Sequence, residues 1–331
     1  METRDPPDLA QAIQAGERVA LAQGITRVES GRPNDRAAAE QLVQALLPQA
    51  GRSFRYGITG IPGVGKSTFI EAFGLDLIER GHRVAVLAVD PSSSTSGGSI
   101  LGDKTRMPRL AVHPAAFVRP TATGGALGGL ARRTREAMIL CEAAGYDRIL
   151  IETVGVGQNE LAVDRLADLT LLLLVSGTGD ELQGIKRGIM ETADVLVINK
   201  IDTAGTTALR SATADLQQAV HFLPAHRGRH PKVLAVSSLT GDGISALTDH
   251  VEELLNADRI AGTMEHGRRA QALAWMQDDL DRGLVELGRE HADLRAALPR
   301  MESLVASGRM DPFQAVSALL ELIRRGAEPL P

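Results

Sequence analysis

GIPGVGKS, residues 60–67, is the stretch that decides the fold, because it matches the phosphate-binding pattern G-x-x-x-x-G-K-[ST] at every fixed position. In such a loop the glycines let backbone N–H groups surround the α- and β-phosphates. The lysine reaches the β- and γ-phosphates, and the serine hydroxyl binds Mg²⁺. The loop needs a strand before it and a helix after it. Residues 53–59 read as a short buried strand and residues 68–79 carry apolar residues at helical spacing, so both requirements are met.

The same stretch supplies the first set of predicted nucleotide-binding residues. These are Gly60, Ile61, Pro62, Gly63, Val64, Gly65, Lys66, Ser67 and Thr68. A chance glycine-rich loop is the alternative interpretation, and the flanking strand and helix argue against it.

A second motif, NKID at residues 199–202, predicts the base that accompanies the phosphates. The Asp202 carboxylate can accept hydrogen bonds from N1–H and the exocyclic amine of guanine, whereas adenine has an acceptor at N1 and lacks that amine. Asn199 can serve the ring edge, and the aliphatic stem of Lys200 can cover the base and the phosphate loop. A loop that ends the following strand can offer backbone N–H to guanine O6, and it consists of Ser237, Ser238 and Leu239. The expected nucleotide is therefore GTP, with GDP as its product.

Two acidic residues that end predicted strands favour a Mg²⁺ site beside Ser67. Asp90 ends one apolar run and Glu152 ends the next buried run. P-loop NTPases hold Mg²⁺ with carboxylates at this end of neighbouring parallel strands. Gly155 can donate its backbone N–H to the γ-phosphate, so residues 154–160 are expected to change shape when that phosphate is lost.

The core is predicted to be an α/β P-loop NTPase with a mostly parallel sheet. Short runs rich in Val, Ile and Leu alternate with helical stretches, which is typical of strands covered on both faces. Residues 130–144 are long enough for a crossover helix between the strand ending at Asp90 and the strand ending at Glu152, so these strands should be parallel. Ras-like GTPases have an antiparallel hairpin there, so the arrangement is closer to the signal-recognition-particle-like branch. The predicted strands after the first cover residues 83–89, 147–151, 169–175, 195–198 and 232–236.

Helical segments are expected on both sides of this core. The chain is predicted to divide into a helical N-terminal arm at residues 1–50, a GTPase domain at residues 51–256 and a helical C-terminal extension at residues 257–331. In the arm, residues 8–30 and 37–46 read as two amphipathic helices. In the extension, residues 265–323 read as two or three helices, with breaks near Pro299 and at residues 308–312.

The composition argues against several classes of protein. A net charge of −5 with only six Phe, two Tyr and one Trp provides neither the basic face nor the stacking platforms that nucleic acid requires. No segment approaches 18 uninterrupted apolar residues and the N-terminus is acidic, so we expect a cytoplasmic protein with no membrane partner. The single cysteine, Cys141, cannot form an internal disulfide and reads as a small buried apolar residue.

Three longer runs resemble the MeaB/ArgK family of G-protein chaperones for adenosylcobalamin-dependent acyl-CoA mutases. They are AVDPSSSTSGGSILGDKTRM at residues 88–107, ETVGVGQNE at residues 152–160 and GDELQGIKRG at residues 179–188. The resemblance implies a Mg²⁺-dependent GTPase that docks on a mutase, gates the loading or release of cobalamin and helps to replace damaged cofactor. Cobalamin itself would belong to the mutase, with methylmalonyl-CoA mutase as the default client. A cobalamin adenosyltransferase is a further partner that the resemblance implies.

The resemblance also implies mobile switches and a homodimer. Asp90 and Asp103 would belong to a first switch and Glu152 to a second. Residues 180–186 would form a third switch that communicates with the partner. Family members form homodimers with the C-terminal helices as the usual contact. A stripe in the extension could make this contact or pack internally, and it consists of Leu273, Met276, Leu280, Leu284 and Leu287.

The residues that would perform hydrolysis are less sharply defined than those that bind GTP. Lys66, Mg²⁺ and backbone donors supply most of what a slow GTPase requires. Asp103 and Lys186 are the catalytic candidates, and Lys104 and Arg106 are further sources of positive charge. Each can equally be read as a solvated loop charge. We expect slow turnover until the mutase orders these loops. The glycine-rich loop at residues 124–129 has no assigned role.

Three other functions compete with this interpretation. A metal-delivery GTPase would need a cluster of soft ligands, but Cys141 stands alone and His226 and His230 flank Gly228, which disfavours one helical face. A transport-linked ATPase or kinase would need an adenine site, against which Asp202 argues. A module that binds GTP without hydrolysing it remains open.

Overall fold

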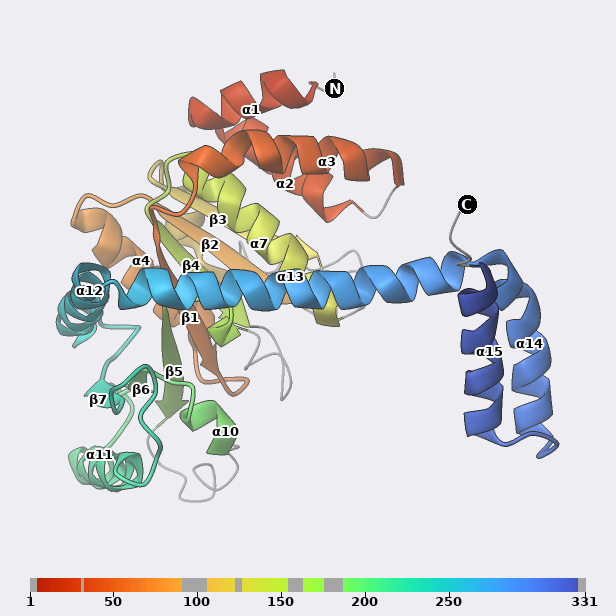
Figure 1. Cartoon of the computed structure of the whole chain (residues 1–331). Helices are drawn as coiled ribbons and strands as arrows, with labels where there is room; N and C mark the ends of the chain where they lie inside the picture. Colours follow the sequence, from red (N-terminus) through yellow and green to blue (C-terminus); the bar gives the residue numbers. More distant parts are fainter. Residues whose placement is uncertain are drawn as a thin grey trace. The chain divides into compact units, whose positions relative to one another are not determined.

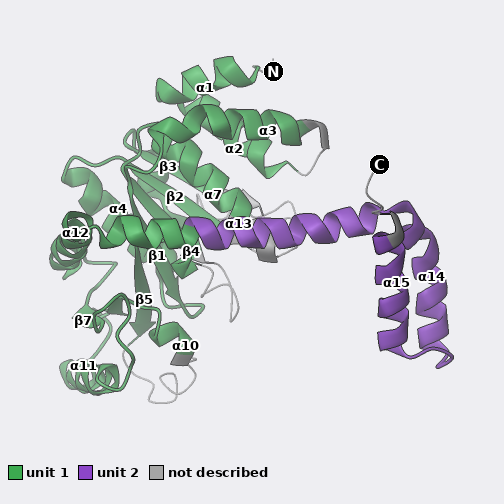
Figure 2. Ribbon diagram, in the orientation of Figure 1, with its two compact units in different colours: residues 1–271 green, residues 272–331 purple. Residues whose placement is uncertain are grey.

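The computed structural model describes six stretches of the chain in two compact units. The described residues are 5–30, 33–90, 106–122, 127–153, 163–175 and 187–326. Unit 1 comprises residues 1–271 and unit 2 residues 272–331, so the boundary falls inside the helix α13 (Thr263–Glu290) (Figure 2).

A seven-stranded parallel sheet forms the centre of unit 1 (Figure 1). The strand order is β3-β2-β4-β1-β5-β6-β7, and all described pairings are parallel. The strands are β1 (Phe54–Gly60), β2 (Val84–Asp90), β3 (Ala116–Ala122), β4 (Arg148–Thr153), β5 (Leu169–Val175), β6 (Val195–Asn199) and β7 (Lys232–Ala235). The fold class expected from the sequence, an α/β P-loop fold with a parallel sheet, is confirmed.

Helices cover both faces of this sheet. On one face, α4 (Lys66–Glu79) contacts α12 (Ile244–Ala261), and both pack on the core that contains Leu171 and Leu173 of β5. On the other face, α11 (Thr206–Val220) packs in a second core with Leu172 and Leu174. Because successive side chains of a strand point to opposite faces, this division explains why β5 is a continuous apolar run rather than an alternating one.

The strand β3 was not expected from the sequence. It is the edge strand beside β2, and it contains Arg119 and Pro120. Proline lacks a backbone N–H donor and is tolerated only at the edge of a sheet, so this run does not resemble the buried strands. The predicted parallel pairing of β2 with β4 is confirmed, with Ala88 opposite Glu152. The crossover helix between β3 and β4 is α7 (Leu127–Ala143).

The described residues of the N-terminal arm form three α-helices rather than two. They are α1 (Pro6–Gln14), α2 (Arg18–Glu29) and α3 (Pro33–Leu46), followed by a short 3₁₀ helix, η1 (Leu47–Gln49). The expectation of one helix over residues 8–30 was wrong, because the chain turns at Gly16, whose φ is 79°. Both α2 and α3 contact α7, and Ile13, Ile25 and Leu42 are fully buried.

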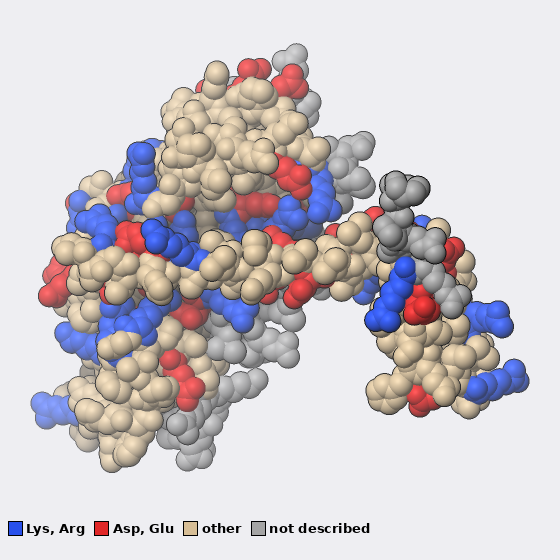
Figure 3. Space-filling model, in the orientation of Figure 1, with Lys and Arg blue, Asp and Glu red and all other residues tan. Residues whose placement is uncertain are grey.

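Two short helices in unit 1 lie near segments that the structure does not describe. They are α6 (Pro108–Val112) and α10 (Arg187–Met190). On the face of unit 1 shown in Figure 3, basic side chains are interspersed with acidic ones. Ion pairs connect neighbouring elements, as where Arg80, the residue that follows α4, pairs with Asp249 of α12.

Unit 2 contains the remainder of α13 and two further helices, α14 (Ala292–Ala306) and α15 (Pro312–Gly326). The break expected near Pro299 was wrong, since this proline lies inside α14. No residue of α14 is buried. The expected break at residues 308–312 does separate α14 from α15. Among the described residues, no helix is long and apolar enough to span a bilayer.

Candidate nucleotide-binding site

The phosphate-binding loop joins β1 to α4, with three glycines in conformations that other residues rarely adopt. The φ angles are 146° at Gly60, 83° at Gly63 and 95° at Gly65. A Cβ atom at Gly60 would lie 2.6 Å from the carbonyl oxygen of Leu173 on β5. At Gly65 it would lie 2.9 Å from the amide nitrogen of Asn199. The first and third glycines are therefore required by close approach as well as by backbone conformation.

This loop borders a cavity of about 610 Å³, which is within the usual size range of small-molecule sites. The Lys66 ammonium lies inside the loop, where it donates to the carbonyl oxygens of Gly60 (2.7 Å) and Ile61 (3.3 Å). The cavity is lined by Pro62, Gly63, Gly65, Lys66, Ser67, Thr68, Arg106 and Glu152. A cavity with a lysine, a helix N-terminus and exposed backbone N–H groups suits a phosphate chain.

Two of the predicted metal ligands lie side by side at this cavity. The Ser67 hydroxyl donates to the Glu152 carboxylate across 3.3 Å, and Glu152 is only 3% exposed. A hydroxyl and a carboxylate are the hard oxygen donors that Mg²⁺ takes in nucleotide sites, where phosphates and water complete the shell. These residues therefore fit Mg²⁺, which would neutralise charge on the bound phosphates. Asp90 ends β2 at the same edge of the sheet, but its side chain lies outside the described part of the structure.

The guanine motif is bonded directly to the phosphate-binding loop. Asn199 donates from Nδ2 to the Val64 carbonyl oxygen (2.9 Å), and Lys200 donates from Nζ to the Gly63 carbonyl oxygen (2.7 Å). Lys200 adopts a positive φ of 63° in this position. The Asn199 Oδ1 atom accepts from the backbone N–H (3.2 Å) and the hydroxyl (2.7 Å) of Ser238. One side chain thus joins the phosphate-binding loop to the loop after β7.

Asp202 and the loop after β7 are also held together. The buried Ser237 hydroxyl donates to Asp202 Oδ1 (2.5 Å) and accepts from the backbone N–H of Thr240 (3.1 Å). Asp202 is exposed, so its carboxylate keeps acceptors for a ligand. Leu239 is 79% exposed beside it. The predicted guanine-binding residues are therefore brought to one place, and their roles toward the base stay predictions.

Several predicted residues lie outside the described part of the chain. These are Asp103, Lys104, Gly155 and Lys186, together with most of the glycine-rich loop at residues 124–129. Of the candidate cations Lys104, Arg106 and Lys186, Arg106 alone lies in the described part of the chain. It lines the phosphate cavity, is exposed, and has no hydrogen bond or ion pair to any residue that the structure describes. Arg106 is therefore the candidate whose position the structure gives.

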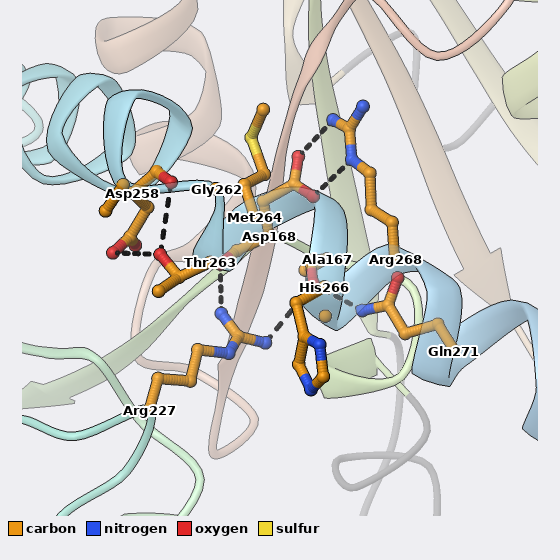
Figure 4. A pocket seen from close by; sticks show the side chains of 12 residues that line it. Ala167, Asp168, Arg227, Asp258, Gly262, Thr263, Met264, His266, Arg268 and Gln271 are labelled. Atoms are coloured by element: carbon orange, nitrogen blue, oxygen red, sulfur yellow. Dashed lines mark hydrogen bonds and ion pairs between the residues drawn. The ribbon is translucent and has the colours of Figure 1, made fainter.

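A network of ion pairs and hydrogen bonds holds residues 163–168, which follow the expected second switch. Figure 4 shows the pair of Asp168 with Arg268 in this network. Arg268 of α13 donates two hydrogen bonds to the Asp168 carboxylate (2.8 and 2.6 Å), and Arg227 donates one to the Asp164 carboxylate (2.8 Å). Burial acts to raise the pKa of Asp164, but the hydrogen bond from His226 and the charge of Arg227 outweigh it and leave that pKa below its ordinary value. A second cavity of about 450 Å³ lies here, but its arginines are already saturated by protein acceptors. We therefore interpret this region as structural support.

One of the two histidines considered for metal delivery lies in this network of ion pairs. His226 lies 3.3 Å from the Asp164 carboxylate within that network. No group of three or more His, Cys, Asp or Glu side chains with metal-binding geometry occurs among the described residues. Cys141 is fully buried, and burial raises the pKa of its thiol. The described part of the chain therefore shows no cluster of side chains that would bind a soft metal ion.

Comparison with known proteins gives a consistent set of similarities. A family model described as methylmalonyl-CoA mutase-associated GTPase MeaB matches residues 21–291. The chain is 47% identical to the GTPase ArgK of Escherichia coli K12 over 313 residues, covering 94% of this chain and 95% of that protein. It is 43% identical over 334 residues to the mitochondrial methylmalonic aciduria type A homolog of Mus musculus, covering 98% of this chain and 80% of that protein. A crystal structure of a LAO/AO transport system kinase superposes with a TM-score of 0.76 at 34% identity, over 98% of this chain and 99% of that one.

Proposed function

Because the chain belongs to the MeaB family of methylmalonyl-CoA mutase-associated GTPases, we propose that it is a Mg²⁺-dependent GTPase that acts as the chaperone of an adenosylcobalamin-dependent acyl-CoA mutase. The GTPase activity is that of the family. The observation that carries the proposal is the direct bonding of the guanine motif to the phosphate-binding loop, through Asn199 and Lys200. In a site built in this way, binding of the base is coupled to binding of the phosphates.

In the proposed role, GTP is a timing signal for another enzyme's cofactor. Bound GTP gates the loading or release of cobalamin on the mutase and supports protection and reactivation of that enzyme. Cobalamin belongs to the mutase. The name of the family and that of the mouse relative favour methylmalonyl-CoA mutase as the client. A cobalamin adenosyltransferase is proposed as a further partner that supplies the loaded cofactor.

Hydrolysis mainly requires positioning and neutralisation of charge. Lys66 supplies positive charge at the phosphate cavity, and Ser67 and Glu152 would hold the Mg²⁺ that neutralises and orients the phosphates further. We assign Arg106 the role of stabilising the charge that develops on the transferred phosphoryl group, because this residue lines that cavity and has no hydrogen bond or ion pair to any described residue. Asp103 and Lys186 remain proposed catalytic residues. Intrinsic turnover is slow, and docking on the mutase accelerates it by ordering the loops.

Nucleotide selectivity separates this proposal from the alternative of a transport-linked ATPase or kinase. Titration calorimetry should show that GTP binds orders of magnitude more tightly than ATP. Asp202→Asn should weaken GTP binding, because an amide cannot accept both guanine N–H groups. Equal affinity for ATP and GTP would contradict the assignment of the base.

The chaperone role requires a test with the client. Single-turnover GTP hydrolysis should accelerate when methylmalonyl-CoA mutase is added, and isobutyryl-CoA mutase should serve as the competing client. Equal rates with and without either mutase would refute the proposal that a partner orders the switch loops. Delivery of a cofactor to another client is the alternative, and co-purification from the native host would reveal that client.

The C-terminal extension is proposed to make a homodimer. In unit 2, Leu273, Leu280 and Leu287 of α13 are 61%, 57% and 65% exposed on one face of the helix. A helix with an uncovered apolar stripe requires a partner. We therefore propose that residues 1–50 form an arm, residues 51–256 the GTPase domain and residues 257–331 an extension whose role is assembly. Light scattering measures whether the full chain is a dimer in solution.

A further inference from the structure

The phosphate-binding helix α4 also holds the segment that carries Arg106. Glu71 lies one and a half turns after Lys66 on α4. Its carboxylate oxygen Oε1 accepts hydrogen bonds from the backbone N–H groups of Arg109 (2.7 Å) and Leu110 (3.2 Å) at the start of α6. These N–H groups have no acceptor within so short a helix, and a carboxylate is the strongest acceptor that a protein can offer them.

Close packing reinforces these hydrogen bonds. Met107 and Leu110 are fully buried in the same core as α4. The Leu110 side chain lies so close to Gly74 of α4 that a Cβ atom there would be 3.0 and 3.2 Å from the leucine methyl carbons. The absence of a side chain at Gly74 therefore lets α6 approach α4. The hydrogen bonds that Arg109 and Leu110 donate to Glu71 then fix the orientation of α6 on this contact.

Arg106 directly precedes the buried Met107. Its backbone position is therefore set by the packing of α6 on α4, and the residue lines the phosphate cavity together with Glu152. The helix that begins with Lys66 thus positions both described cations of the cavity. It holds Lys66 through its own first turn and Arg106 through Glu71.

We propose that Glu71 is a positioning residue for GTP hydrolysis. Glu71 anchors α6 to α4 and so holds Arg106 beside the transferred phosphoryl group. This inference rests on the role proposed above for Arg106. Glu71 does not line the cavity, so its loss should affect the rate of hydrolysis through the placement of Arg106 rather than through the binding of GTP. Small displacements of a charge-stabilising group reduce rates strongly because stabilisation depends on preorganised geometry.

The test is a double-mutant cycle in the full chain, measured as single-turnover hydrolysis at saturating GTP and Mg²⁺. Arg106→Ala should lower the rate about 100-fold or more. Glu71→Ala should lower it about 10-fold with GTP affinity unchanged, and it should have no further effect when Arg106 is already alanine. Glu71→Gln should restore most of the rate because the amide oxygen still accepts. Glu79→Ala is the matched control, since Glu79 is exposed on the same helix with no partner among the described residues.

The outcomes separate this inference from the role of Arg106. If Arg106→Ala hydrolyses GTP at the unmodified rate, the role proposed for Arg106 fails and the inference fails with it. If Arg106→Ala is impaired but Glu71→Ala behaves like Glu79→Ala, the inference alone fails. It also fails if Glu71→Ala lowers the rate equally in both backgrounds, because Glu71 would then act independently of Arg106. Circular dichroism confirms folding, and Glu71→Gln provides the comparison if the alanine variant is unstable.

Discussion

Replacing Arg268 with alanine should destabilise unit 1 by about 3 kcal/mol, because it leaves a buried carboxylate without its cation. The Asp168 side chain is 1% exposed and receives both hydrogen bonds of the Arg268 fork. Arg268 also donates to the carbonyl oxygens of Gly51 and Ser53, both at 2.5 Å. Removing one partner of a buried pair costs about 3–5 kcal/mol. The lower end applies here because Asp168 keeps the backbone N–H of Arg55 and borders an open cavity.

Urea titration followed by far-UV circular dichroism measures this loss. Fluorescence is less suitable because the single tryptophan, Trp275, lies in unit 2. In a thermal scan the midpoint should fall by about 6 °C, at about 2 °C for each kcal/mol in a domain of this size. Arg269→Ala is the matched control, since the neighbouring Arg269 is exposed and has no partner among the described residues. A loss below about 1 kcal/mol, or one equal to that of the control, would refute the reasoning from the buried pair.

Three further predictions concern the nucleotide site, pH and assembly. Gly65→Ala should abolish tight GTP binding in a fluorescent-nucleotide titration, because a Cβ atom at φ 95° would displace Asn199; unchanged affinity would contradict this. Burial raises the pKa of Glu252, but hydrogen bonds from Arg148 and Tyr56 outweigh it and lower that pKa below its ordinary value. The ionised Glu252 therefore stabilises the fold fully above pH 4.5, and this stabilisation is lost as the pH falls through the lowered pKa. In urea titrations, Glu252→Gln should have a smaller free energy of unfolding at pH 7, and that free energy should fall less steeply on acidification. Leu280→Glu should convert the proposed dimer to a monomer in light scattering without changing the GTP affinity, and a dimer that persists would exclude the α13 stripe as the contact.

The sequence predicted most of the fold because the buried strands carry their own signal. A strand such as β5 is covered on both faces, so each of its positions must be apolar and the run is recognisable without any knowledge of its neighbours. The edge strand β3 lacks this signal, since Arg119 and Pro120 are acceptable only where a strand is not enclosed. The break at Gly16 was missed for a related reason. Glycine is tolerated within helices, and only the structure shows its positive φ.

In the candidate site, local motifs were predictable and long-range anchors were not. Ser67 and Asp202 were found because each belongs to a short pattern whose spacing is fixed by the nucleotide. Arg268 and Asp168 are 100 positions apart and carry no pattern, so nothing in either neighbourhood indicates that they pair. The same holds for Glu71, which resembles any charged residue on the outside of a helix until the position of α6 is known. Residues that act on the ligand leave a local signature, whereas residues that act through other residues require the fold.

The bonds between the two nucleotide loops have a consequence for selectivity. Asn199 and Lys200 accept no bond from the phosphate-binding loop; they donate to its carbonyl groups at Val64 and Gly63. Engaging the Val64 carbonyl orients the peptide that it shares with the Gly65 N–H, and this N–H points away from the guanine motif because the two groups lie on opposite edges of a trans peptide. The N–H that shares a peptide with the Gly63 carbonyl is that of Val64, which donates to the Ile61 carbonyl (3.4 Å). A base that displaces Asn199 therefore also disturbs the orientation of the Gly65 N–H, a donor of the phosphate-binding loop. Discrimination against ATP in this protein should then appear in the rate of hydrolysis as well as in affinity, because the base and the phosphates are held by one bonded unit.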